Sequence, residues 1–479
     1  MIGNSNAEYI WVVFWVVVLH SIGPISVAYC LSSPFLPHYL QLPRYLRYWA
    51  LAETAFYILT YLYQKYHLER PALHPLLTSK EERNRLFDLC LNTTHDHAHY
   101  LSKWFMDKDV SAIKRENVKE FFQWAFLNTD VIDPIHDEEL DDYVKKLEAR
   151  MGTEFEHGRT DVKSLRLTLD KVNALHRSLI WYMFYRASTW QSIAILPPRP
   201  HAFVASIRSP SEDISYWYQA HTSKTELPVV FLHGIGVGLY PYMEFLKELN
   251  QGRKEEDGKI GILAVEILPI SSRLTSPILQ KEEMCLQIRA ILHRHGFEKF
   301  VLVSHSYGSV ITTHLLKTPD MARTISSVIL VDPITILLNQ PDVAYNFTRR
   351  RPRYASEWLL WYFGSKDMGV AHTLSRKFFW SENILWKEDV LDHRCVIFLG
   401  EKDSIINSSK VLAYLQDGMQ VTSKGEDMAD TDCLRSKPRN PSGSLNVVWC
   451  SGLNHGQVFD LPVWRARLKS EILKEAQCV

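Results

Sequence analysis

From about residue 200 to the C-terminus, short runs rich in β-branched residues alternate with segments whose apolar residues recur every three or four positions. This alternation predicts a parallel sheet with helices on both faces. Helices are expected at Pro277–His295 and Gly308–Lys317, among others. The apolar runs predict strands at Ile214–Ala220, Pro228–Leu232, Ile262–Ile267, Phe300–Ser304, Val328–Val331, Val396–Leu399 and Leu445–Trp449. Residues 191–479 are therefore expected to form an α/β domain with a doubly wound, mostly parallel sheet.

Residues 71–190 have helical periodicity instead, and they predict a helical accessory region. Helices are expected at Lys80–Leu91, Val118–Leu127 and Ser164–Tyr185. His95, His97 and His99 form the sequence His-Asp-His-Ala-His, and His95 and His99 would share one face of a helix, which is a spacing found in zinc sites. No fourth ligand follows nearby, so a solvated helix end explains them better, and we expect no metal.

The N-terminal segment Tyr9–Leu31 contains no Asp, Glu, Lys or Arg across its twenty-three residues. As a helix it would be about 35 Å long, which is enough to cross a hydrocarbon core of about 30 Å. We therefore expect residues 1–70 to form a membrane anchor, with membrane lipid as a partner. A cleaved signal peptide with its apolar part at Ile10–Leu19 and a buried soluble helix remain alternatives.

A second apolar stretch, Leu46–Tyr63, contains Arg47 and Glu53. These charges favour a helix at the membrane interface, or one docked on the protein, over a second crossing. Arg44 and Arg47 follow the first apolar run, whereas Glu8 precedes it. A single crossing would therefore leave the bulk of the chain, including the catalytic domain, on the cytosolic side of a membrane that the sequence does not identify.

Composition and charge exclude several classes of protein. The chain is 46% hydrophobic and 23% charged, as globular proteins are, and its 54 basic residues balance 54 acidic ones. Without a net charge or a long basic run, we expect no nucleic-acid partner. The seven cysteines are scattered and never spaced as Cys-x-x-Cys, which argues against a disulfide framework and a thiolate zinc site.

A candidate nucleophile follows the predicted strand Phe300–Ser304. The residues Ser304-His305-Ser306-Tyr307-Gly308 lead from this strand into a predicted helix, which is the context of a nucleophile elbow. The tight turn needs small residues on both sides of the nucleophile, and Ser304 and Gly308 are small. Glycine is more usual at the first position. Ser306 is therefore the predicted nucleophile.

A serine hydroxyl needs a base, and the base needs an acid that orients it. His455 follows the last predicted strand and is the predicted base. Asp403 follows the preceding strand and is the favoured acid, with Asp332, at the end of an earlier strand, as the alternate acid. Whichever carboxylate is not the acid is expected to buttress a loop.

Acyl transfer also needs donors for the developing oxyanion. The turn His233-Gly234-Ile235-Gly236 follows a predicted central strand. The backbone N–H groups of Ile235 and Tyr307 are the predicted oxyanion hole, and His233 is expected to brace the turn. The glycine spacing does not fit a dinucleotide-binding loop, so we expect no cofactor there.

In this order, His233-Gly234, Ser304–Gly308, Gly400-x-x-Asp403 and His455 resemble the α/β-hydrolase superfamily from about Ser192 to the C-terminus. More loosely, the apolar anchor and helical region make the whole chain look like membrane-associated α/β-hydrolase-fold proteins of fungi. The resemblance implies cleavage of an ester, thioester, amide or lactone without a cofactor. The superfamily also includes lyases, condensation catalysts and inactive relatives.

About sixty residues, 333–394, separate two predicted strands and should form a helical cap over the site. Their many aromatic residues, more than half of which should form the cap's own core, favour a lipophilic small-molecule substrate. We therefore expect a membrane-associated, esterase-like or lipase-like serine hydrolase that works through an acyl-enzyme. The alternative is a non-hydrolytic tailoring enzyme that catalyses condensation, cyclisation or elimination. Residues Ser423–Ser444 are expected to form a mobile surface loop.

Overall fold

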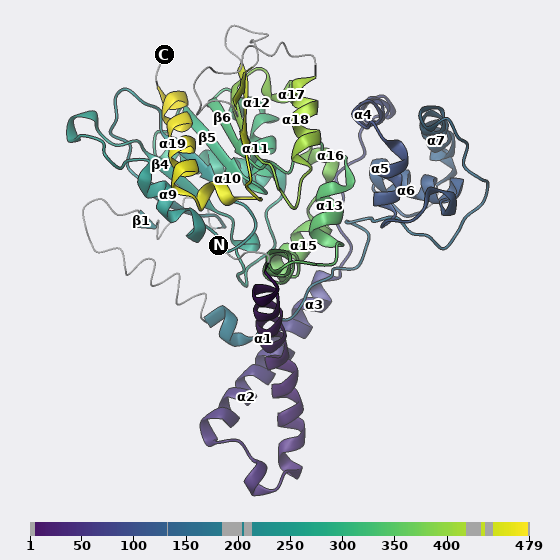
Figure 1. Cartoon of the computed structure of the whole chain (residues 1–479), viewed down its shortest axis with the longest axis vertical. Coiled ribbons are helices and arrows are strands. Elements are labelled where there is room, and N and C mark those ends of the chain that lie inside the picture. The colour runs from purple at the N-terminus through teal and green to yellow at the C-terminus, as the bar shows by residue number, and fades with distance from the viewer. Residues whose placement is uncertain are drawn as a thin grey trace.

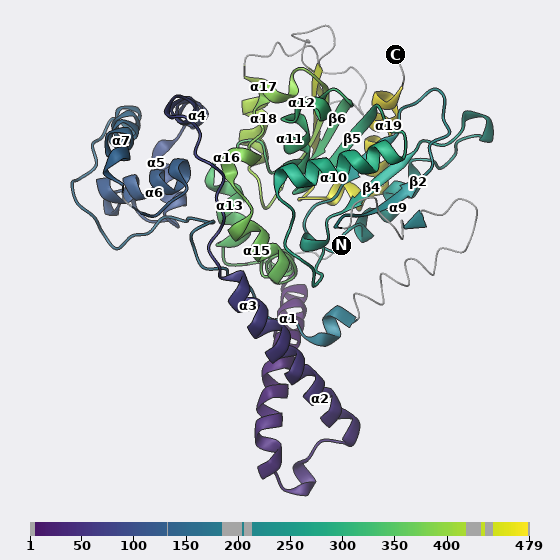
Figure 2. The same cartoon turned by 180° about the vertical axis from the view of Figure 1, so that it is seen from behind.

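A computed structural model describes residues 5–131, 133–183, 204–205, 213–417, 433–435 and 444–477. The predicted boundary near residue 190 lies outside these residues, and so does most of the loop expected at Ser423–Ser444. A helical stalk, residues 5–68, projects from the rest of the described chain, which we call the body (Figure 1). Within the body, the accessory helices lie at one side of the sheet and its covering helices (Figures 1 and 2).

The body contains one sheet, and nine strands of the described residues form it in the order β1-β2-β4-β3-β5-β6-β7-β9-β8. The six strands from β4 to β9 in this order run parallel, while β1, β2 and β8 pair antiparallel at the two edges. The strands are β1 (Val204–Ala205), β2 (Ser215–Gln219), β3 (Val229–Leu232), β4 (Ile262–Glu266), β5 (Phe300–His305), β6 (Ile325–Val331), β7 (Arg394–Gly400), β8 (Cys433–Arg435) and β9 (Ser444–Cys450).

Alternate residues of each central strand pack against helices on opposite faces, because successive side chains of a strand point to opposite sides. Val229 and Phe231 of β3 share a core with α9 (Met243–Glu248) and α19 (Pro462–Ala476). Val230 and Leu232 face the opposite core, which includes side chains of two further helices. These helices are α10 (Lys281–Arg294) and α11 (Gly308–Leu316), and α12 (Pro319–Ala322) and α18 (Ser408–Gln416) complete the sheet domain.

All seven predicted strands are confirmed, and so are the two predicted helices between them, α10 and α11. The prediction of one continuous helix at Ser164–Tyr185 is wrong for residues 164–178, which form turns and extended chain. The N–H of Leu165 donates to the carbonyl of Trp104, and that of Leu175 donates to the carbonyl of Lys366. The apolar residues of this segment therefore pack against separate neighbours, and their spacing imitated a helical face.

Between β6 and β7 lies the cap, a group of helices that rests beside the sheet (Figure 1). Tyr362 and Phe378 are buried within it, while Trp358 and Trp361 remain partly exposed. The helices are α13 (Pro341–Thr348), α14 (Ala355–Leu359), the π-helical turn η9 (Leu360–Ser365), α15 (Met368–Arg376), α16 (Trp380–Asn383) and α17 (Lys387–Val390).

The accessory region packs against the cap and shares one continuous apolar core with the sheet domain. The indole N–H of Trp380 donates to the carbonyl of Ala125, and the side-chain amide of Gln340 donates to the hydroxyl of Thr94, both at 2.8 Å. The accessory helices are α4 (Lys80–Asn92), α5 (His97–Trp104), α6 (Arg115–Leu127) and α7 (Asp137–Met151). Of these, α4 and α6 confirm the predicted helices at Lys80–Leu91 and Val118–Leu127.

The stalk is an antiparallel pair of helices (Figures 1 and 2). Its outgoing helix, α1 (Asn6–Ser32), begins with a capping box in which Ser5 and Glu8 bond each other's backbone N–H groups. The returning leg is continuous through α2 (Arg44–Phe56), the π-helical turn η3 (Tyr57–Leu62) and α3 (Tyr63–Leu68). Residues 6–35 are the one stretch of the described chain long and apolar enough to cross a membrane, and a signal sequence would pass the same test.

A buried ion pair connects two accessory helices and predicts a large effect on stability. Arg83 donates to both carboxylate oxygens of Glu139, at 2.8 and 2.7 Å. Replacing Arg83 with Leu leaves a buried carboxylate without its cation, so we expect the free energy of unfolding to fall by about 3 kcal/mol. Chemical denaturation measures this loss. Arg85 lies exposed on the same helix, and Arg85→Leu should change stability by less than about 0.5 kcal/mol; equal losses would contradict the prediction.

Candidate active site

Ser306 lies on a sharp turn between β5 and α11, in a strained backbone conformation. Its φ is +50°, which non-glycine residues rarely adopt, and its N–H donates to the carbonyl of Val331. A Cβ added to Gly308 would lie 2.4 Å from the carbonyl oxygen of Leu232, so this position requires glycine. Ser304 fits on the other side, where its hydroxyl accepts a bond from Thr312 at 2.9 Å. The turn has the geometry of a nucleophile elbow.

His455 lies between Ser306 and Asp403 and contacts both. Its Nε2 is 2.8 Å from the Ser306 hydroxyl, and its Nδ1 is 2.6 Å from a carboxylate oxygen of Asp403. A carboxylate only accepts, so Nδ1 carries the proton and Nε2 is free to accept the serine proton. The structure therefore brings the three predicted residues into one chain of hydrogen bonds.

The second oxygen of the Asp403 carboxylate accepts the N–H groups of Ile405 and Ile406, at 2.7 and 3.0 Å. These bonds hold the carboxylate in position to accept the hydrogen bond from the Nδ1–H of His455. Burial lowers the pKa of His455, but the charge and hydrogen bond of Asp403 and the charge of Asp332 outweigh it, so the pKa is raised overall. The site is thus suited to stabilise the imidazolium that forms when His455 takes a proton.

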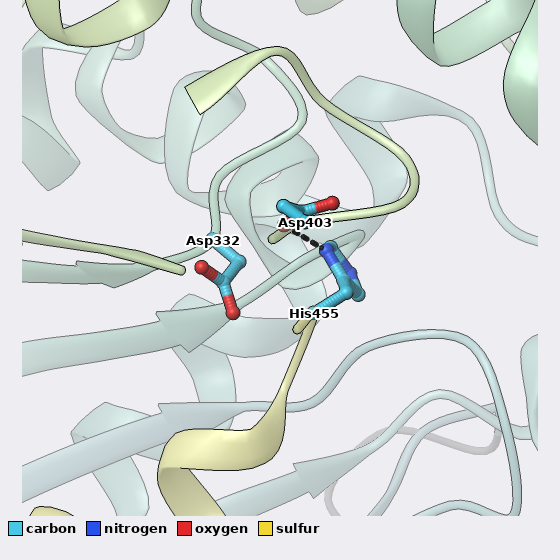
Figure 3. Close-up of side chains that lie close together, drawn as sticks. All are labelled: Asp332, Asp403 and His455. Carbon is cyan, nitrogen blue, oxygen red and sulfur yellow. Dashed lines mark hydrogen bonds and ion pairs between the residues drawn. The ribbon is translucent and has the colours of Figure 1, made fainter. Parts of the chain in front are cut away.

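Asp332, the alternate acid, lies near His455 but, unlike Asp403, does not bond its ring (Figure 3). Its fully buried carboxylate accepts the N–H of Gly400 at 2.8 Å and that of Gly456 at 2.7 Å. Burial and the neighbouring Asp403 raise its pKa, despite the opposing influence of His455 and the two N–H groups. Asp332 therefore joins the end of β7 to the loop that carries His455, which is the buttressing position expected for the other carboxylate.

Ligand atoms of Asp332, Asp403 and His455 lie within 4.8 Å of one another, as a small metal site would require (Figure 3). Their hydrogen bonds explain this cluster without a metal. The Nδ1 proton of His455 bonds Asp403, its Nε2 faces Ser306, and the carboxylate of Asp332 accepts two backbone N–H groups. These donor atoms are occupied by protein partners, which suits proton transfer better than metal binding.

The glycine turn after β3 passes close to Ser306. A Cβ on Gly234 would lie 2.8 Å from the Cβ of Ser306, so only glycine permits this approach. Among the described residues, neither the N–H of Ile235 nor that of Tyr307 has a hydrogen-bond acceptor. Both are therefore available as the predicted oxyanion donors. His233 braces the turn as expected, because it bonds the carbonyl of Gly234 and accepts the N–H of Ile267.

Two supporting residues were not found from the sequence. The side-chain oxygen of Asn454 accepts the N–H groups of His455 and Ser404, and so couples the base loop to the acid loop. The hydroxyl of Tyr242 lies 2.7 Å from His305 Nδ1 and accepts the N–H of Gly234 at 3.3 Å. Asn454 directly precedes the predicted base, and this position could have identified it from the sequence. Tyr242 belongs to none of the motifs, so no sequence pattern indicated its role.

An apolar pocket opens at Ser306, and its wall comes from the accessory region, the turn after β3, the cap and the loop after β7, which contributes Ile405. The accessory region contributes Trp104, Trp124 and Leu167, and the turn after β3 contributes Ile235. Apart from Ser306 and Thr348, its lining among the described residues is apolar or aromatic; cap residues include Leu338, Phe347, Leu374, Phe378 and Trp380. The accessory helices are thus part of the site, which the sequence pattern did not indicate.

The strand order, the antiparallel β2 at one edge and the elbow between β5 and α11 define the α/β-hydrolase fold. Its reactive side chains lie where strands β5, β7 and β9 end, the usual location of sites in open α/β sheets. The chain therefore has the α/β-hydrolase fold, with a chain of hydrogen bonds typical of a serine hydrolase.

No protein-family model matches the sequence, and no curated protein matches it. Solved structures do. Naproxen esterase from Bacillus subtilis is 13% identical with a TM-score of 0.38, and the match covers 61% of this chain and 96% of that chain. Carboxylesterase CesB from the same organism is 11% identical with a TM-score of 0.35, and the match covers 61% of this chain and 98% of that chain. A bacterial membrane phospholipase A is 11% identical with a TM-score of 0.38, and the match covers 62% of this chain and 94% of that chain. These matches are to esterases and other hydrolases, and at this level they say nothing about particular residues.

Proposed function

We propose that this protein is a membrane-associated serine hydrolase that cleaves an ester or a related acyl bond of a lipophilic substrate. The observation that carries this proposal is the unbroken series of hydrogen bonds from Ser306 through His455 to Asp403. A strained serine, a correctly oriented imidazole and a buried carboxylate together are a costly arrangement that a purely structural role does not need.

The proposed reaction has two halves. The Ser306 hydroxyl attacks the acyl carbon while Nε2 of His455 accepts its proton, and the N–H groups of Ile235 and Tyr307 stabilise the oxyanion. Collapse of the tetrahedral intermediate breaks the bond to the leaving group, which receives the proton from His455 and leaves an acyl-enzyme. Water then attacks the acyl-enzyme, with His455 again transferring the proton, and the acid product and Ser306 are released.

The pocket supports a lipophilic acyl group. Apolar groups line almost all of its wall, so a polar acyl group would lose its hydration there without gaining hydrogen bonds. A hydrocarbon chain gains about 0.8 kcal/mol for each methylene that it buries. The indole N–H of Trp124 is bonded to Thr168 and is not free to recognise a polar ligand.

The stalk supports retention at a membrane. Val12 and Val16 of α1 are buried in one apolar cluster with Ala355 and Tyr362 of the cap. Cleavage of a signal peptide would remove this half of the cluster, which favours a retained helix over a signal sequence. We accordingly propose that α1 is a membrane anchor, with membrane lipid as the partner.

Modification by a fluorophosphonate probe tests the nucleophile. The wild-type protein should be labelled and should hydrolyse p-nitrophenyl acyl esters, whereas Ser306→Ala should lose both activities, because it removes the hydroxyl that contacts Nε2 of His455. Ser276 is exposed elsewhere in the same domain, and Ser276→Ala should react like the wild type. Absence of labelling in folded wild-type protein would refute the proposal and favour the non-hydrolytic alternative.

The pH dependence of labelling tests the acid. His455 must be neutral to accept a proton, so the rate of labelling should rise with pH as His455 loses its proton. Because the pKa of His455 is raised, the midpoint of this rise should lie above pH 6.5. Asp403→Asn removes the main raising influence, so the midpoint should move to lower pH, while the plateau rate falls by about 10⁴-fold. Asp332→Asn should destabilise the fold but move the midpoint less. A larger shift in Asp332→Asn would instead make Asp332 the acid.

Widening the pocket tests the substrate class. Trp124→Leu removes an aromatic ring from the accessory wall, so preference measured as kcat/KM should move toward longer acyl chains by about tenfold, equivalent to about 1.4 kcal/mol. The assay is a series of p-nitrophenyl esters of increasing chain length. Trp386 of the cap is not part of this lining, and Trp386→Leu should leave the order of preference unchanged. An unchanged order in Trp124→Leu would exclude this wall from acyl binding.

A further inference from the structure

The stalk exposes an apolar surface that no part of the described chain covers. Side chains around α1 are more than half exposed, as are Leu51 and Leu59 of the returning leg. A helix that is apolar on every side is stable in water only when other protein surrounds it. The exposed α1 residues include Ile10, Trp11, Phe14, Val17, Ile25 and Leu31.

The N-terminal end of α1 lies at the body, and the helix runs away from it (Figures 1 and 2). The cluster of Val12 and Val16 with Tyr362 holds this end against the cap. The far end turns back through η1 (Ser33–Phe35) and η2 (His38–Leu40), where the Leu42 N–H donates to the Tyr29 hydroxyl at 3.1 Å. Both ends of the stalk therefore meet the body on the same side.

Arg47 and Glu53, the two charges that argued against a second membrane segment, do not lie on the exposed middle of the returning leg. Glu53 has no exposed surface, and both of its carboxylate oxygens accept the N–H of Leu179, at 2.9 and 3.0 Å. His176 lies 3.5 Å from the same carboxylate. Arg44 and Arg47 lie in the first turn of α2, at the tip of the stalk. The returning leg thus exposes no acidic or basic side chain between Arg47 and Lys65.

We propose that the stalk enters the bilayer tip first, as a hairpin, and leaves the N-terminus and the catalytic body on the same side of the membrane. This topology rests on the proposed membrane association and replaces the single crossing predicted from the sequence. It also replaces the cytosolic assignment of the body, because Arg44 and Arg47 then lie at the tip, across the bilayer from the body. A single crossing would put the N-terminus opposite the body and would separate Val12 and Val16 from the cap.

The chemistry of the stalk fits lipid as the occupant of this surface. Its exposed sides are mainly apolar, both aliphatic and aromatic, whereas the tip is rich in tyrosine and arginine, residues that favour the headgroup region. Tyr39, Tyr45 and Tyr48 are 83%, 71% and 58% exposed there. About 1.5 Å per residue gives roughly 26 Å from Trp15 to Ser32, comparable to a hydrocarbon core of about 30 Å.

The locations of the two termini test the topology. Full-length protein with one epitope tag at each end is produced in sealed membrane vesicles and treated with an external protease. We expect both tags to be digested, or both protected, in the same vesicle preparation. Digestion of one tag and protection of the other, in protein that still sediments with the membrane, would overturn the hairpin.

A fluorescent probe tests whether lipid covers the stalk. The variant Ile25→Cys is made in a protein that also carries Cys30→Ser, Cys433→Ser and Cys478→Ser. The new cysteine is labelled with an environment-sensitive dye, and the protein is reconstituted into phosphatidylcholine vesicles. Nitroxide-labelled lipids should quench this probe strongly. They should not quench the matched probe on Lys254→Cys, a residue exposed on the body. Equal quenching at both positions, or a shielded probe at residue 25 that lipid does not quench, would overturn insertion.

These outcomes separate the topology from the proposed function. Release of the protein from membranes by a carbonate wash would refute the inserted anchor, and the hairpin with it. Loss of fluorophosphonate labelling would refute the hydrolase while leaving the position of the tags unaffected. Opposite tag locations in a labelled, membrane-bound protein would refute the hairpin alone.

Discussion

The 2.8 Å contact between His455 and Ser306 depends on residues that are 149 positions apart in the chain, and much of the body serves to hold them together. Each side of the contact is fixed separately. The elbow forces Ser306 into a left-handed conformation that needs Gly308 beside it. The loop of His455 is tied down by Asp332 and Asn454, which bond backbone groups rather than the imidazole. Preorganisation of this kind removes the entropy of assembling the groups from the reaction itself.

Different hydrogen-bond partners give two nearby buried carboxylates different tasks. Asp403 directs one oxygen to the His455 ring and the other to two backbone N–H groups, so its charge faces the imidazole. Asp332 directs both oxygens to backbone N–H groups, and its charge is used to join two loops. A buried carboxylate is tolerated only when hydrogen bonds replace its hydration, which both residues achieve. Their hydrogen-bond partners, rather than their distance from His455, assign the roles.

Apolar packing extends the site beyond the sheet domain. The accessory helices share their core with the cap and bring Trp104 and Trp124 to the pocket wall. The same cap holds the first turns of the stalk through Tyr362. One group of helices therefore connects the substrate pocket to the segment proposed to enter lipid, so the pocket is held at a fixed position relative to the membrane.

The sequence by itself determined the strands, the elbow and the places of Ser306 and His455 at strand ends, because each depends on a local pattern or on the residues that follow a strand. The tertiary structure showed that Asp403, and not Asp332, bonds the imidazole of His455, a difference that the sequence could not show because both residues follow strands. It also decided that residues 164–178 are not helical, that accessory tryptophans line the pocket and that both legs of the stalk return to the body. These features arise from contacts between distant segments, which carry no signal in the spacing of residues along the chain.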